Sequence, residues 1–258
     1  MKVTVLGSGG STGTPAVELG WGACDSNNPK NRRLRPGLYV QKEDNSILVD
    51  TGPDLREQLL ANKITQADAV IYTHAHADHT HGLNDVRSLN RLMNKALPAY
   101  MSVETHQQLS ESFPWVFEEI PENKNFYKPT LEPKIITSNE YRTIADIDCQ
   151  FFEQSHGFST SYGILFDKKF AFTTDVVAMS DEALKAYENV EHWMVGMIGF
   201  KPHPTHADYD TIKKWADRIQ PKHIWITHIG LNLDHNELIE QLPDNMQPTY
   251  DGHIITIE

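Results

Sequence analysis

Short apolar runs separated by polar turns recur along the chain and predict strands with helices between them. Strands are expected at residues 3–6, 38–41, 47–50, 69–73, 149–154, 162–166, 170–174 and 223–227. Helices are expected at residues 53–62, 86–94, 181–188 and 209–219. Pro53 stands at an early position of the first helix, where proline is well tolerated. Residues 98–133 give no clear pattern.

The predicted strands gather in each half of the chain, which favours sheets flanked by helices in a layered α/β or α+β fold. No fixed-period repeat and no Gly/Ser-rich linker divides the sequence, so we expect one domain over residues 1–258. With 39% hydrophobic and 22% charged residues, the composition is that of a globular protein with a sizeable core.

Charge and cysteine content restrict the classes of function. A formal net charge of −12 opposes attraction to polyanions, so a nucleic-acid substrate is disfavoured unless a basic patch or metals offset it. The two cysteines, Cys24 and Cys149, argue against a disulfide framework and a four-cysteine zinc site. No apolar run approaches the roughly 20 residues of a membrane span. The first apolar run stops at Gly7, too early for a signal peptide, so we expect a cytoplasmic location.

The segment from His74 to His79, His-Ala-His-Ala-Asp-His, carries the clearest chemistry and follows directly on the predicted strand 69–73. Three imidazoles and a carboxylate are costly to bury unless they bind something. This donor set suits zinc, manganese or iron, and two sets of ligands in one loop can serve two ions. A solvated polar loop is the alternative. It is disfavoured because the apolar strand directs the cluster to a sheet edge, where such folds tend to place sites.

This spacing resembles the His-x-His-x-Asp-His hallmark of the metallo-β-lactamase superfamily, whose fold is a four-layer αββα sandwich with one or two metal ions at the sheet edges. The family pattern needs three later ligands at strand ends, and His156, Asp175 and His228 each follow a predicted strand. The resemblance therefore implies an α/β (α+β) sandwich that binds two divalent metal ions, zinc or manganese.

The resemblance also assigns roles to single residues. The implied ligands are His74, His76 and His156 for one ion, Asp78, His79 and His228 for the second, and Asp175 between the two. Asp50, in Asp-Thr-Gly, matches an early element of the superfamily whose aspartate orients the metal-binding loop. A simple turn aspartate before glycine is the alternative for Asp50.

Two further segments resemble the phosphodiesterase branch, which includes transfer-RNA 3′-processing nucleases and the phosphoribosyl 1,2-cyclic phosphate phosphodiesterase of phosphonate breakdown. In the glycine-rich loop 7–15, Ser8 and Gly9 are candidate substrate contacts, because glycine lets backbone amides approach a phosphate closely. A plain tight turn explains this loop equally well. His206 matches a histidine of the cyclic phosphodiesterase that is thought to protonate the leaving oxygen, and His203 is a second candidate there. A surface histidine before a helix is the alternative.

The sequence departs from the phosphonate-pathway enzyme at a structural zinc site. That enzyme binds the additional zinc with several cysteines in the loop after the first strand and with a histidine soon after the last metal ligand. Residues 21–28 retain only Cys24 here, and Gly230 and Leu231 follow His228-Ile229. We therefore expect no structural zinc. Its loss leaves the catalytic site intact but weakens the expectation of an identical substrate.

The expected activity is hydrolysis of a small cyclic ribose or nucleotide phosphodiester. A hydroxide shared by two metal ions would attack phosphorus, with His206 as general acid and Asp78 as a further catalytic residue. A transfer-RNA processing nuclease and a thiolesterase or lactonase are alternatives on the same metals. A non-catalytic metal-binding or redox module is a fourth hypothesis.

The expected partner is a small phosphodiester or nucleotide-like molecule, and neither a membrane nor a nucleic acid is expected. Arg32, Arg33 and Lys201 could contact a phosphate, but they are better explained as solvated surface charges. Relatives of this kind are commonly homodimers, although no residue here demonstrates one.

Overall fold

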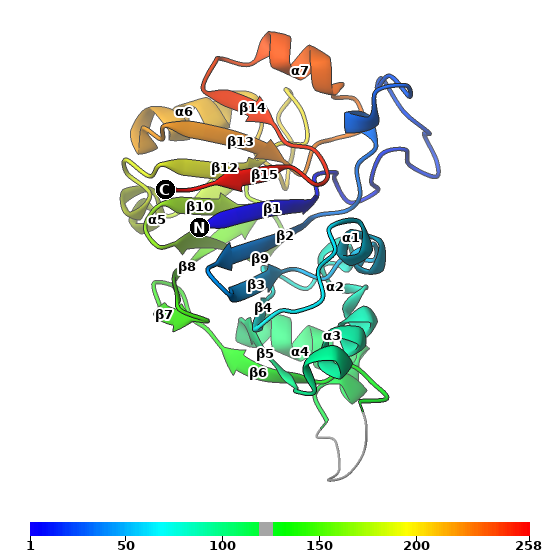
Figure 1. Ribbon diagram of the computed structural model, residues 1–258. Coiled ribbons are helices and arrows are strands. Elements are labelled where there is room, and N and C mark those ends of the chain that lie inside the picture. Colours follow the sequence, from blue (N-terminus) through cyan, green and yellow to red (C-terminus); the bar gives the residue numbers. More distant parts are fainter. Residues whose placement is uncertain (119–125) are drawn as a thin grey trace.

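The first of two β-sheets has seven strands in the order β15-β1-β2-β3-β4-β5-β6 (Figure 1). The computed structural model describes residues 1–118 and 126–258. The strands of this sheet are β1 (Lys2–Gly7), β2 (Gly37–Lys42), β3 (Asn45–Val49), β4 (Ala69–Ile71), β5 (Leu97–Met101), β6 (Leu131–Ile135) and β15 (Ile254–Thr256). Strands β15, β1, β2 and β3 pair antiparallel, whereas β3, β4, β5 and β6 run parallel.

The second sheet has eight strands in the order β11-β8-β9-β10-β12-β13-β14, with β7 paired to β8. Its strands are β7 (Tyr141–Ile144), β8 (Ile147–His156), β9 (Ser159–Phe166), β10 (Phe170–Thr173), β11 (Ala178–Met179), β12 (His192–Gly196), β13 (His223–Thr227) and β14 (Met246–Pro248). Both β8 and β10 pair antiparallel with β9 and therefore run in the same direction. Strands β12, β13 and β14 continue parallel to β10.

The helices are α1 (Leu55–Ala61), α2 (Ala77–Thr80), α3 (Val86–Met93), α4 (Val103–Ser112), α5 (Asp181–Ala186), α6 (Tyr209–Ile219) and α7 (His235–Gln241), with 3₁₀ turns at Pro29–Asn31, Leu83–Asp85 and Pro114–Val116. Several begin at a side-chain cap, as where Asp208 accepts from the Thr211 N–H at the start of α6. None of the helices in the described residues is long and apolar enough to cross a membrane.

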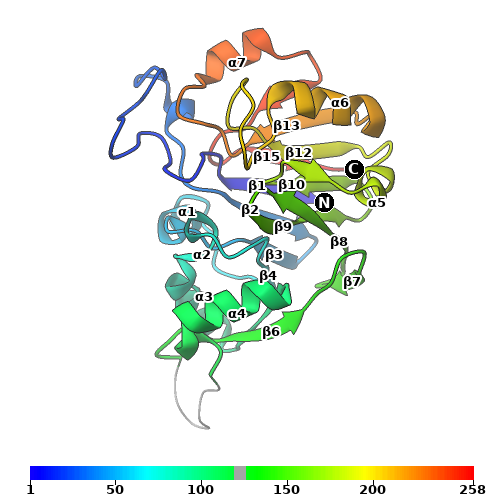
Figure 2. The same ribbon diagram turned by 180° about the vertical axis from the view of Figure 1, so that it is seen from behind.

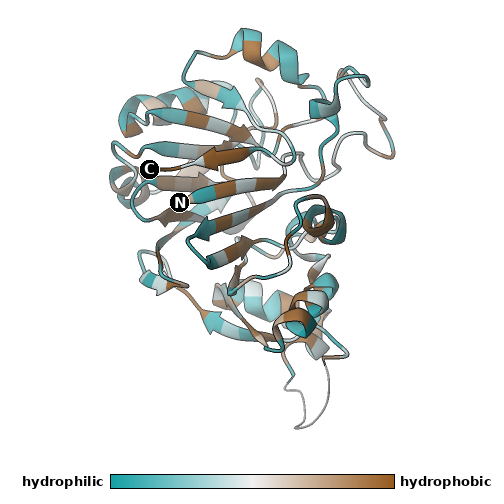
Figure 3. Cartoon of the chain, in the orientation of Figure 1, coloured by the Kyte–Doolittle hydropathy of each residue, from teal (hydrophilic) through white to brown (hydrophobic). Residues whose placement is uncertain are grey.

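Alternation along the strands divides the apolar side chains into three clusters. Val3 of β1 and Phe170 of β10 belong to a cluster that lies between the two sheets. On the outer face of the first sheet, Leu48 packs with Leu55 of α1, and a third cluster joins the second sheet to α5, α6 and α7. Figure 3 shows hydrophobic residues gathered in the strands of the two sheets. The layers are therefore helix, sheet, sheet and helix, and the predicted αββα sandwich is confirmed.

Several elements coincide with the prediction, and others differ for local reasons. The predicted helix 209–219 and strand 223–227 match α6 and β13. The helix predicted from Pro53 begins at Leu55, and the carboxylate of Asp54 before it accepts from Arg35 and does not cap the helix. Both termini lie side by side in the two views (Figures 1 and 2), where the Met1 amino group donates to the Ile257 carbonyl at 2.7 Å.

The expectation of a solvated Arg33 is wrong, because its side chain is only 1% exposed. Its Nη2 donates to the Leu233 carbonyl at 2.7 Å and to Asn31 Oδ1 at 3.0 Å. Its backbone exchanges two hydrogen bonds of 2.9 Å with Thr14. The guanidinium thus joins the irregular segment after β1 to the segment that follows His228. It donates hydrogen bonds to the carbonyls of Gly230 and Leu233, which are buried away from water.

Candidate metal centre

The carboxyl ends of five strands deliver polar side chains to one edge of the two sheets. Because β3 and β4 run parallel, as do β8, β10 and β13, their ends lie together. The residues so placed are Asp50 after β3, residues 74–79 after β4, His156 at the end of β8, Asp175 after β10 and His228 after β13. This arrangement brings together the residues that the sequence proposed as metal ligands.

Three of these residues adopt a left-handed backbone conformation. The φ angles are 63° for Asp50, 47° for Asp175 and 49° for His228. Such angles are uncommon in residues other than glycine and cost on the order of 1–3 kcal/mol each, and they cluster at functional sites. Hydrogen bonds hold the strained turn at Asp175, where Ser161 Oγ donates to its carbonyl at 2.8 Å and Thr174 Oγ1 donates to its Oδ1 at 2.6 Å.

Among the described residues, three groups of side chains could hold a metal ion, and Asp175 belongs to the first group and, with His206 and His228, to the third. The first group is His74, His76, His156 and Asp175, the second is Asp78, His79 and His228, and the atoms within each group lie within 4.8 Å of one another. Asp175 Oδ1 lies 3.2 Å from His79 Nε2 and 3.3 Å from His228 Nε2. Its Oδ2 lies 3.3 Å from His156 Nε2 and 3.8 Å from His74 Nε2. Each oxygen of one carboxylate therefore faces a different group.

Several buried histidine nitrogens at this centre lack hydrogen-bond partners. Within residues 1–118 and 126–258, Nε2 of His74, His79 and His228 has none. Leaving a buried polar atom unpaired costs about 1–3 kcal/mol. Several such atoms converging on one carboxylate indicate that a ligand belongs between them.

The buried carboxylates of the centre favour positive charge beside them, although burial itself opposes it. Burial opposes ionisation of Asp175, yet His228 and His79 hold the pKa of its carboxyl well below the usual range. Burial also opposes charge on His79, but the carboxylates of Asp175, Asp78 and Asp50 raise the pKa of His79 well above its usual value. Divalent cations would supply this positive charge, and an imidazole and carboxylate donor set fits zinc or manganese.

Asp50 binds the side of His79 that faces away from the centre. Its Oδ2 accepts from His79 Nδ1 at 2.7 Å, while its two oxygens accept from the Thr73 N–H and hydroxyl, each at 2.8 Å. This contact fixes the imidazole so that Nε2 points at the metal position. Asp50 therefore lies where it can orient the imidazole of His79, one of the candidate ligands.

Asp50→Asn is expected to lower metal affinity about 10- to 100-fold. An asparagine can still accept from Thr73, but its amide hydrogens face the N–H of His79, so the preferred ring orientation is lost. Metal content after dialysis against graded chelator concentrations measures the effect. Asp181→Asn, which alters an exposed ion pair with Arg218, is the control. Equal metal retention by both variants would show that Asp50 does not orient a ligand.

His206 lies against both groups of ligands. Its Nδ1 is 3.9 Å from Asp175 Oδ2, and its ring centroid is 4.8 Å from that of His228 and 4.9 Å from that of His156. Burial, followed by the nearby His228, lowers the pKa of His206 to about 3. His203 is exposed, with its ring 5.2 Å from that of His206. Both histidines therefore lie at the centre, one buried within it and one at its rim.

Ser8 and Gly9, the two candidate substrate contacts in the glycine-rich loop, form hydrogen bonds with other parts of the protein. The Ser8 N–H and hydroxyl both donate to Asp251 Oδ1, at 2.9 and 2.8 Å, and the Gly9 N–H donates to the Leu34 carbonyl at 2.9 Å. These donors are engaged, so the loop does not offer them to a phosphate in this structure. The neighbouring Gly10 lies beside the ring of His228, where an added Cβ would stand 3.6 Å from the imidazole.

Sequence reasoning missed the backbone contact that orients His156. The His156 Nδ1–H donates to the carbonyl of Thr205 at 2.7 Å. A carbonyl carries no side-chain signature, so only the fold could reveal this partner. The same contact ties the segment that carries His206 to a candidate ligand.

Known proteins are similar to this chain in sequence and in fold. Residues 45–229 match the family described as "Beta-lactamase superfamily domain". A solved structure described as a new diphosphatase from the PhnP family is 33% identical, with a TM-score of 0.89, and the similarity covers 98% of this chain and 96% of that one.

Two curated proteins are also similar. An octanoyltransferase of Porphyromonas gingivalis is 28% identical over 261 residues, which cover 98% of this chain and 51% of that protein. The chain thus spans about half the length of that relative. A ribonuclease Z of Bradyrhizobium sp. (strain ORS 278) is 39% identical over 70 residues, covering 26% of this chain and 23% of that protein.

Proposed function

Because the chain belongs to the metallo-β-lactamase superfamily, we propose that this metal-dependent hydrolase is a dinuclear phosphodiesterase that acts on a small cyclic ribose or nucleotide phosphodiester. In this proposal the whole chain, residues 1–258, forms one hydrolase domain. The observation that carries the proposal is the carboxylate of Asp175, whose two oxygens face two separate groups of metal-ligand atoms.

The proposed ligands are His74, His76 and His156 for one zinc or manganese ion, Asp78, His79 and His228 for the other, and Asp175 for both. When bound, such ions supply Lewis acidity toward phosphoryl oxygens and a water that is reactive at neutral pH. Asp50 and the Thr205 carbonyl hold the imidazoles of His79 and His156 in place. Orientation fixed before the substrate arrives costs no reorganisation during the reaction.

His206 is proposed as the proton donor to the leaving group. As the oxygen of water bonds to phosphorus, the bond from phosphorus to the leaving oxygen breaks, and the departing oxygen takes its proton from the imidazole. Burial disfavours the charged imidazole, whereas the negative charge of a bound phosphodiester favours it. The position of His206 against both ligand groups supports this role.

A substrate panel tests the proposal. Protein loaded with zinc or manganese is expected to hydrolyse bis-p-nitrophenyl phosphate together with cyclic and linear nucleotide phosphodiesters, and to lose this activity in a chelator. The measurement is the initial rate for each substrate at matched metal content. Rapid hydrolysis of a glutathione thioester without phosphodiester cleavage would instead support the thiolesterase alternative. A visible absorption band without hydrolysis of any substrate would support a redox or binding module.

A transfer-RNA processing nuclease is the second candidate, because of the similarity to ribonuclease Z over part of the chain. The net charge of −12 works against it, since binding of RNA depends on contacts between basic residues and phosphates. Binding of a precursor transfer RNA that weakens steeply with salt would favour the nuclease over the small-molecule phosphodiesterase.

A further inference from the structure

The turn between β8 and β9 carries an unpacked aromatic side chain beside the candidate metal centre. Phe158 is 95% exposed and lies two residues after His156. His156 pairs with Ser159 across the hairpin, so Gly157 and Phe158 form a two-residue turn. Gly157 has a φ of 74°, a conformation that such turns reserve for glycine. The turn needs its glycine, but it does not need a phenylalanine at the second position.

This turn packs against the segment that carries His206. A Cβ added at Gly157 would lie 2.7 Å from the Pro204 carbonyl and 2.8 Å from Thr205 Cγ2. The hydrogen bond from His156 to the Thr205 carbonyl, at 2.7 Å, holds the two segments together at the adjacent residue. The backbone of the turn that carries Phe158 is therefore held against the segment that carries His206, the proposed proton donor.

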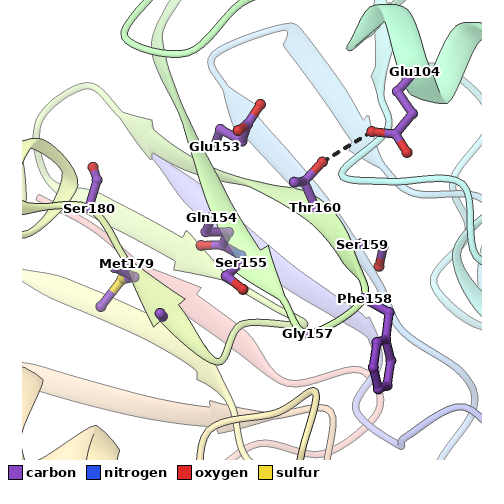
Figure 4. A pocket seen from close by; sticks show the side chains of 11 residues that line it. Glu104, Glu153, Gln154, Ser155, Gly157, Phe158, Ser159, Thr160, Met179 and Ser180 are labelled. Atoms are coloured by element: carbon purple, nitrogen blue, oxygen red, sulfur yellow. Dashed lines mark hydrogen bonds between the residues drawn. The ribbon is translucent and has the colours of Figure 1, made fainter.

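A cavity of about 620 Å³ opens at the same turn and is lined by Phe158 and by hydroxyl-bearing residues such as Ser155 and Thr160. The carboxylates of Glu104 and Glu153 also line it. Figure 4 shows Phe158 at the tip of the hairpin with its ring directed away from Glu104. Carboxylates disfavour a second phosphate in this cavity, while hydroxyls and carboxylates can bind the hydroxyls of an uncharged sugar.

We propose that Phe158 is a specificity-determining residue that stacks on the base of an uncharged nucleoside, which is the alcohol released from the phosphodiester. The inference rests on the proposed function and adds the class of leaving group to it. In a linear phosphodiester, water adds across the bond between phosphorus and the leaving oxygen, so the products are a free nucleoside and a phosphomonoester. Every nucleobase offers an aromatic face, so stacking on Phe158 selects for a nucleoside without selecting its base.

The test compares two substrates that differ only in the leaving alcohol. Uridylyl-(3′,5′)-adenosine releases adenosine, and the methyl ester of uridine 3′-phosphate releases methanol, while both yield uridine 3′-phosphate. Phe158→Ala is expected to raise KM for the dinucleoside roughly tenfold and to leave KM for the methyl ester unchanged. Phe158→Tyr keeps an aromatic face and is expected to behave like the parent. Leu92→Ala removes a side chain that is 65% exposed on α3 and serves as the control.

The outcomes separate this inference from the function on which it rests. If Phe158→Ala alters KM for both substrates equally, or for neither, Phe158 does not recognise the leaving group even though the phosphodiesterase proposal stands. If the parent hydrolyses neither substrate, adenosine binding is followed by NMR in the parent and in Phe158→Ala. Binding that weakens only in Phe158→Ala supports the nucleoside site, and equal binding or no binding overturns it.

Discussion

Asp175→Ala is expected to reduce phosphodiester hydrolysis at least about a thousandfold and to prevent retention of two metal ions. The two oxygens of the Asp175 carboxylate face both sets of candidate ligands. Metal ions contribute several kcal/mol to stabilising the transition state, and each 1.36 kcal/mol corresponds to a tenfold change in rate. Metal content by elemental analysis and the rate on bis-p-nitrophenyl phosphate are measured on the same sample.

Asp167→Ala is the matched control for this substitution. Asp167 also has a φ of 47° and follows a strand of the same sheet, but it pairs with Lys42 at 2.7 Å, away from the centre. Alanine in a left-handed conformation costs on the order of 1–2 kcal/mol at either position. Both variants should therefore lose similar backbone stability, and only Asp175→Ala should lose metal. Two metal ions retained by Asp175→Ala would contradict the proposed arrangement of ligands.

The candidate ligands could be proposed from the sequence because each follows an apolar run. The loop from His74 to His79 has short internal spacing, and His156, Asp175 and His228 each come at or just after the end of a predicted strand. The resemblance to the superfamily pattern selected these residues from among the other polar residues at strand ends, and the parallel strands explain why the side chains meet, since their carboxyl ends lie at one edge. The alternation of apolar and polar positions predicted layers of sheets and helices, and the resemblance to the superfamily supplied the αββα order that the three apolar clusters show.

Several local features of the protein, in backbone conformation and in side-chain burial, have no corresponding pattern in the sequence. The left-handed conformations of Asp50 and Asp175 arise from turns whose geometry depends on the packed sheets. Arg33 lies in a segment without periodicity, and its burial depends on carbonyls of residues 230 and 233, far away in the sequence. Residues 98–133 include α4, whose amphipathic pattern is weak, and part of that range lies outside the described residues. Long-range contacts of this kind leave no local signal for sequence reasoning to use.

Local sequence signals and long-range contacts also differ at His206. Its position could be proposed from the sequence, whereas its burial beside other histidines could not. A histidine shortly before a helix N-terminus can be found in the sequence, and α6 begins at Tyr209 as predicted. Its burial between the rings of His156 and His228 comes from two separate strand ends. The positions of these strand ends set the distance from His206 to the candidate ligands, and the proposed role of His206 as proton donor depends on that distance.

His206→Ala is expected to slow hydrolysis of phosphodiesters with alkoxide leaving groups about 10²- to 10⁴-fold, because the departing oxygen loses its proton donor. Hydrolysis of bis-p-nitrophenyl phosphate should change little, since p-nitrophenolate leaves without a proton, and metal content should equal that of the parent. His203→Ala, which removes the exposed neighbour at a ring distance of 5.2 Å, is the control and should leave both rates intact. Equal losses on alkoxide and p-nitrophenolate substrates would assign His206 to the support of the metal centre. A loss on alkoxide substrates in His203→Ala alone would transfer the role of proton donor to His203.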